Sequence, residues 1–216
     1  IAYLYPTYTH KLAINYLNNN IGLFDKNVYV VGHSKGGNLA LVSSMELSTF
    51  KHNKIKNIYN FDGPGLRKSE FEGEKYNRIK NKLINIVPSG SYIGVLLYNE
   101  NYHVVKTSAH AINEHYPMSW NIFGIDFVKG KLTKGSANLI KRTTTNISHI
   151  DEEKLKEIFE ESFKIFRDRE TKNIKITLTD IKNLIKNISK MDPELSSYVS
   201  VIFTSIMNMK ENRNEK

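Results

Sequence analysis

The sequence of 216 residues contains no cysteine, which excludes disulfide bonds, thiolate metal sites and a cysteine nucleophile. It also lacks any apolar run approaching the roughly 20 residues that span a bilayer, so no transmembrane segment is expected. The chain opens Ile1-Ala2-Tyr3 without a methionine or a basic-then-apolar leader, and we expect a fragment of a longer protein. A hydrophobic content of 40% is ordinary for a globular chain with one sizeable core.

Charge of one sign is not concentrated in any block of the chain. The formal net charge is +9, but lysine and arginine are spread evenly and no basic stripe is interleaved with aromatic residues. We therefore expect a lysine-rich solvated surface and no nucleic-acid partner. We expect a cytoplasmic protein without metal or cofactor, and the sequence leaves its oligomeric state open.

One stretch organises the rest of the sequence. Four β-favouring residues, 28–31, run into Gly32-His33-Ser34-Lys35-Gly36, and a helix-compatible segment follows at once. Strand, sharp turn and helix with a serine at the apex form a nucleophile elbow, in which the serine hydroxyl stands clear of the sheet. Gly32 and Gly36 supply the small neighbours that such a turn needs, and Gly37 allows close packing of the helix. An ordinary glycine-rich turn is the alternative.

Alternating strands and helices predict a parallel α/β sheet. Further strands are expected at 55–61, 83–87 and 102–107, and helices at 7–18, 36–50 and 69–81, with an apolar loop or short helix at 92–98. Sites in such sheets lie at the carboxyl ends of the strands. Ser34 follows the first strand, Asp62 the second, and a histidine-containing loop the last.

The acid and the base are less sharply specified than the nucleophile. Asp62 is the leading acid, although a turn aspartate would also suit Asp62-Gly-Pro-Gly, and Glu100 and Glu114 are the reserves. His110 and His115 both follow the last strand, and the pattern of residues does not choose between them. His33 is an elbow spacer whose side chain is expected to point away from the nucleophile.

Four motifs carry a family resemblance over about residues 1–125. The elbow Gly32 to Ala40 is similar to that of the fungal-type, class three lipases. Together with segments 60–65, 87–97 and 102–120 it resembles a bacterial family of lipase-like α/β-hydrolases of unknown function, also called Mbeg-like proteins.

The resemblance implies a site and an incomplete domain. It favours His115 over His110 as the base, although Tyr116 stands where the family commonly has aspartate. It also implies earlier strands and a second oxyanion donor before Ile1, so the backbone N–H of Lys35 is the one donor that can be named.

Residues 126–216 change to a helical pattern. Apolar stripes follow helix-start signals at 151, 177 and 192, and most simply represent core contacts, with a lid, partner or membrane surface as alternatives. We therefore predict two parts: 1–125, the C-terminal part of an α/β-hydrolase domain whose parallel sheet is N-terminally truncated, and 126–216, a C-terminal helical region.

These expectations lead to two function hypotheses. The first is a serine hydrolase in which Ser34, Asp62 and His115 form a triad acting on a small-molecule or lipid acyl ester or thioester. The second is a non-catalytic binding module with the same fold.

Overall fold

The computed structural model describes residues 6–146 together with Asn183 and Lys186. The chain divides into two compact units, residues 1–144 and 145–216, and the first is described below. The helices predicted to begin at 151, 177 and 192 lie outside the described residues.

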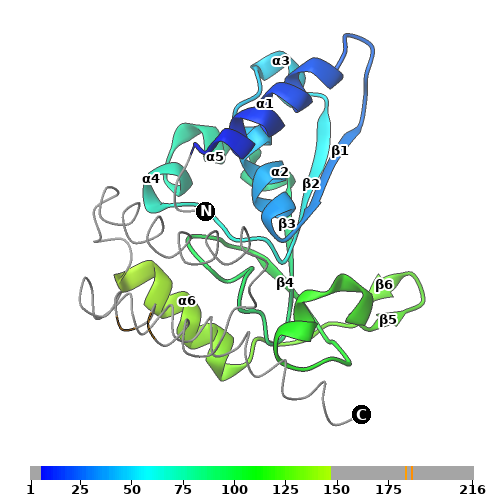
Figure 1. The fold of residues 1–216 in the computed structure, drawn as a ribbon. Coiled ribbons are helices and arrows are strands. Elements are labelled where there is room, and N and C mark those ends of the chain that lie inside the picture. Colours follow the sequence, from blue (N-terminus) through cyan, green and yellow to red (C-terminus); the bar gives the residue numbers. More distant parts are fainter. Residues whose placement is uncertain (1–5, 147–182, 184–185, 187–216) are drawn as a thin grey trace, which may run out of the picture. The chain divides into compact units, whose positions relative to one another are not determined.

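The first unit is built on a four-stranded parallel sheet (Figure 1). Its strands are β1 (Val28–His33), β2 (Ile55–Phe61), β3 (Leu83–Pro88) and β4 (Tyr102–Val105), and their spatial order is the order of the sequence. The prediction of a parallel α/β sheet is confirmed. β4 ends two residues earlier than predicted, because Lys106 and Thr107 leave β3 and pair with the returning segment around Trp120 and Val128.

Helices cover the β1–β2 side of the sheet. α2 (Lys35–Met45) packs against β1 and β2, and α1 (Tyr8–Asn20) packs against α2. The predicted helix 36–50 is divided, since the chain turns after Met45, buries Leu47 and begins again as α3 (Thr49–His52).

The segment between β2 and β3, predicted as one helix at 69–81, is also divided. Gly73 separates α4 (Lys68–Phe71) from α5 (Glu74–Ile79), which runs into the short helix η1 (Lys80–Lys82). Tyr76 of α5 is almost completely buried and donates a hydrogen bond to Glu100. Segment 92–98 is an irregular and largely buried loop.

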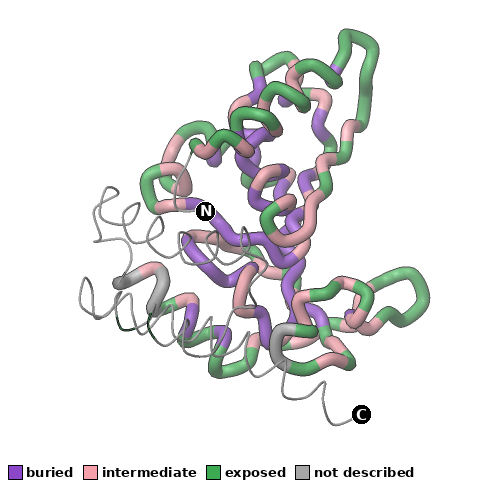
Figure 2. The backbone as a smooth tube through the Cα atoms, in the orientation of Figure 1, coloured by how far each residue is buried: buried purple, intermediate pink, exposed green. Residues whose placement is uncertain are grey.

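Side-chain alternation along the strands produces two cores. Val28 and Val30 of β1 pack with Ile58 of β2 beneath α2, on one face of the sheet. On the other face, Phe61 contacts Trp120 and Phe127. Figure 2 shows buried residues along β2, β3 and the loop after β2, and the exposed loop that leads into β1.

The chain after β4 adds Trp120 and Phe127 to the second core and forms four short elements and one longer helix in the described residues. These are η2 (Ala111–His115), η3 (Pro117–Ser119), β5 (Ile122–Phe123), β6 (Asp126–Phe127) and α6 (Lys134–Asn146). β5 and β6 form a hairpin, and Phe127 packs on Trp120. The division predicted between residues 125 and 126 stays a prediction. Among the described residues no helix is long and apolar enough to cross a membrane.

A buried histidine connects the two helices above the sheet. His10 is 1% exposed; its Nδ1 accepts the backbone N–H of Thr7, so Nε2 carries the hydrogen and donates to Asn38 Oδ1 at 2.9 Å. Burial lowers the pKa of His10, with repulsion from Lys35 adding to the effect and the Asn38 hydrogen bond opposing it. Burial also lowers the pKa of His52. The fold therefore favours the neutral form of both imidazoles.

Stability should fall in acid as a result. A histidine with a lowered folded-state pKa stabilises the fold fully above its unfolded pKa of about 6.5, and this contribution is lost as the pH falls through the folded value. We expect the free energy of unfolding to decrease from pH 7.5 to 5.5 by less in His10→Gln than in the original chain, as measured by urea unfolding. His103→Gln, at an exposed position of β4, should keep the original decrease. Equal pH dependence in all three proteins would contradict the role of His10.

Candidate active site

The elbow forms where β1 ends. Ser34 has φ 56° and ψ −127°, a strained conformation for a residue with a side chain. Its backbone N–H still continues the sheet ladder by donating to the Phe61 carbonyl at 2.9 Å. Although Ser34 stands at the N-cap position of α2, its hydroxyl does not cap the helix, as serine usually does there. The hydroxyl is therefore left available above the sheet.

Close packing explains two of the three elbow glycines. A Cβ on Gly32 would lie 2.0 Å from the Gly36 carbonyl oxygen, and one on Gly37 would lie 2.0 Å from Asn60 Oδ1 of β2. A Cβ on Gly36 would meet nothing within 4 Å. The expectation that Gly36 must be small on its own account is wrong, because the close approach is between its carbonyl group and Gly32.

Asp62 follows β2 in the same manner as Ser34 follows β1. Its φ is 47°, and its N–H donates to the Ile86 carbonyl of β3 at 2.8 Å. The side chain is 1% exposed and has several donors. Oδ2 lies 2.7 Å from His115 Nδ1, while Oδ1 accepts from the Ser91 hydroxyl and, at 3.0 Å, from the Gly94 N–H. These donors satisfy the buried carboxyl group and hold it in one orientation.

Two buried asparagines shape the turn that begins at Asp62. Asn60 both donates to and accepts from the Gly63 backbone at 3.0 Å. Asn38 of α2 donates to the carbonyl groups of Pro64 and Gly65. The turn is therefore bound to the first turn of the helix that carries the elbow.

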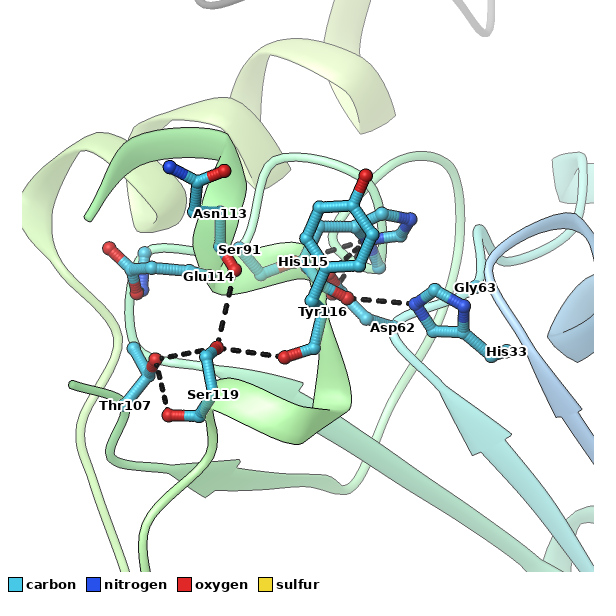
Figure 3. A network of polar contacts seen from close by, with 12 residues as sticks. His33, Asp62, Gly63, Ser91, Thr107, Asn113, Glu114, His115, Tyr116 and Ser119 are labelled. Carbon is cyan, nitrogen blue, oxygen red and sulfur yellow. Dashed lines mark hydrogen bonds and ion pairs between the residues drawn. The ribbon is translucent and has the colours of Figure 1, made fainter. Parts of the chain in front are cut away.

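His115 sits on a loop with several anchors (Figure 3). The Trp120 indole donates to the Glu114 carbonyl at 2.7 Å, and the Glu114 carboxylate accepts from the Gly90 N–H at 2.8 Å. The Ser119 hydroxyl links η2 and η3 by donating to the Asn113 and Tyr116 carbonyl groups. The Ser-Trp pair of the sequence motif thus positions the histidine that precedes it.

The structure does not bring the other candidates to Asp62. His110 is exposed at the start of η2. Glu100 accepts from Tyr76 Oη at 3.0 Å, and Glu114 is bonded to Gly90. Burial raises the pKa of Glu114, while the Gly90 hydrogen bond opposes that rise. Both reserve acids therefore have structural partners elsewhere.

His33 lies differently from the sequence expectation. Its Nε2 donates to the His115 backbone carbonyl at 2.8 Å, and the two rings are 4.5 Å apart at an interplanar angle of 38°. This contact between the two histidines was not predicted from the sequence, and the orientation of His33 away from Ser34 stays a prediction. Ser91 and Gly94 also received no role from the sequence, although both stand in a motif that carries the family resemblance.

Ser34 and His115 are not joined by a hydrogen bond. Across the described residues, the Ser34 hydroxyl has no hydrogen-bond partner. Lys35 begins α2, where backbone N–H groups lack helical partners, and its side chain reaches Thr9 Oγ1 at 3.3 Å. Within residues 6–146, no group of three or more histidine or acidic side chains is arranged to hold a metal ion.

The elbow geometry predicts opposite outcomes for two glycine substitutions. Gly32→Ala should destabilise the fold by about 3 kcal/mol or more, because backbone atoms must move apart. Gly36→Ala should change the free energy of unfolding by less than about 1 kcal/mol, since its Cβ has space and alanine favours the helix. Urea unfolding of the two variants measures the difference. Similar losses in both would contradict the packing described for the elbow.

Comparison with known proteins gives a family for the chain that carries this site. No curated protein and no solved structure matches it. A family model described as Mbeg1-like matches residues 1–164, a span that includes all four parallel strands, the elbow and the Asp62–His115 pair. The chain therefore belongs to the Mbeg1-like family.

Proposed function

We propose that the protein is a serine hydrolase with an α/β-hydrolase-type sheet, related to the class three lipases. In the reaction, Ser34 Oγ attacks an acyl carbonyl while His115 Nε2 takes its proton. Asp62 holds Nδ1 of the same ring and stabilises the imidazolium that forms. His115 then protonates the leaving group, and water releases the acyl group from Ser34 by the same path.

The observation that carries this proposal is the hydrogen bond between buried Asp62 and partly buried His115, formed at the strand end next to that of the strained Ser34. The 2.7 Å contact from Asp62 Oδ2 to Nδ1 leaves Nε2 as the ring nitrogen able to face a nucleophile. Ser34 and Asp62 follow neighbouring strands, and the Gly63 backbone packs closely on the Ser34 carbonyl group. The chain order of nucleophile, acid and histidine is that of α/β-hydrolases.

An acyl ester or thioester, small or lipid-derived, is the substrate class that fits this chemistry. The Lys35 N–H at the start of α2 is the proposed oxyanion donor, since helix N-termini favour developing negative charge. No metal ion or cofactor is required for this reaction.

One observation favours a second candidate, a binding module that does not turn over substrate. The Ser34 hydroxyl has no hydrogen bond to His115 among the described residues. Catalytic hydrogen bonds are often long before substrate binds, which keeps the hydrolase as the first candidate. Covalent labelling separates the two.

Labelling with a fluorophosphonate probe tests the nucleophile and the base in the full-length protein. We expect the original protein to be labelled and Ser34→Ala to be unlabelled, because no other group receives the phosphorus. His115→Ala should slow labelling by about 10²- to 10⁴-fold, since the proton acceptor is lost. His110→Ala, in the same loop, should stay within about twofold of the original rate.

Two results would contradict this assignment. Labelling that persists in Ser34→Ala would exclude Ser34 as the nucleophile. Equal losses in His115→Ala and His110→Ala would show that the loop as a whole, and not the Asp62-bonded ring, supports the reaction. A folded protein that is never labelled would favour the binding module.

A further inference from the structure

We propose that His33, through its ring Nε2–H, is a positioning residue for His115. This inference rests on the proposed role of His115 as the base. His33 ends β1 and precedes the nucleophile, so it ties the histidine loop directly to the strand that carries Ser34. The sequence pattern of the elbow gives this spacer position no such role.

The hydrogen bond from His33 is accepted by the backbone of His115, whose ring must be placed correctly to act as the proposed base. His115 O accepts from His33 Nε2 at 2.8 Å, and in the described part of the chain no second donor reaches this carbonyl group. The acceptor has no hydrogen, so the His33 tautomer is fixed with its proton on Nε2. Removing the donor would leave a partly buried carbonyl without a partner.

The remaining anchors of the loop act one residue or more away. Trp120 and Gly90 hold Glu114, and Ser119 holds Asn113 and Tyr116. Asp62 fixes only Nδ1 of the His115 ring. Without His33, the ring could pivot about its contact with Asp62, and Nε2 would move relative to the Ser34 hydroxyl.

Ring packing adds a second restraint on the same side chain. The two imidazole rings lie 4.5 Å apart, close enough for the face of His33 to limit the rotation of His115. Hydrogen bond and ring contact are separable by substitution. Phenylalanine keeps a flat ring without the donor, while glutamine keeps an N–H donor of similar reach without the ring.

The test compares His33→Phe with His33→Gln in the full-length protein, using hydrolysis of 4-nitrophenyl butyrate. If the hydrogen bond positions His115, His33→Phe should lower kcat about tenfold with KM within about twofold, because a misplaced base impairs the chemical step. His33→Gln should retain most of the original kcat. His103→Phe and His103→Gln, at an exposed position of β4, are the matched controls and should behave like the original protein.

A second measurement does not depend on activity. The proton between His115 Nδ1 and Asp62 should give a far-downfield ¹H NMR signal, assigned by its loss in His115→Gln. We expect this signal to broaden or disappear in His33→Phe and to persist in His33→Gln. Circular dichroism confirms that each variant is folded.

The outcomes separate this inference from the proposed function. Equal kcat in His33→Phe and His33→Gln, or an NMR signal unchanged in His33→Phe, would overturn the positioning role. If the original protein neither hydrolyses the ester nor reacts with the fluorophosphonate, the hydrolase proposal fails, and the NMR comparison alone decides whether His33 positions His115.

Discussion

The site depends on one buried carboxyl group. Asp62 is 1% exposed, and the burial of such a polar group is costly unless it is hydrogen-bonded. Its donors come from two different loops: Ser91 and Gly94 after β3, and His115 after β4. Each loop therefore has to reach the end of β2 for the carboxylate to be stable there, and the placement of His115 follows from that requirement.

The parallel sheet prepares this arrangement at two neighbouring strand ends. Ser34 and Asp62 each donate a final ladder hydrogen bond through their backbone N–H, and each then leaves the sheet through a positive φ. Because this backbone geometry occurs at the ends of two neighbouring strands, the Ser34 hydroxyl and the Asp62 carboxyl group lie at the same edge of the sheet. Asn60 and Asn38 stabilise the conformation after Asp62, since together they bind the Gly63, Pro64 and Gly65 backbone. The unfavourable positive φ values are confined to these residues, and the surrounding hydrogen bonds maintain them.

Local sequence patterns predicted the parts of the fold that depend on near neighbours. The β-favouring run, the glycines and the helix-compatible segment around Ser34 indicated strand, turn and helix, and turn residues after 61 put an acid at the next strand end. Features that depend on distant segments were not predictable. The length of β4 is set by pairing with Trp120, the break at Gly73 is followed by burial of Tyr76, and the His33 side chain turns toward a residue 82 positions later in the chain. The residues alone left His110 and His115 equivalent, because only the folded loop brings one of them to Asp62.

The strand order has a consequence for biosynthesis. Because β1, β2, β3 and β4 lie side by side in the order of translation, a growing chain can add each strand to a neighbour that has already left the ribosome. Ser34 and Asp62 are in place as soon as β1 to β3 have associated, whereas His115 arrives only after β4. A nascent chain thus carries Ser34 before it carries the imidazole proposed to activate it, and the Asp62–His115 hydrogen bond can form only after β4 has been made.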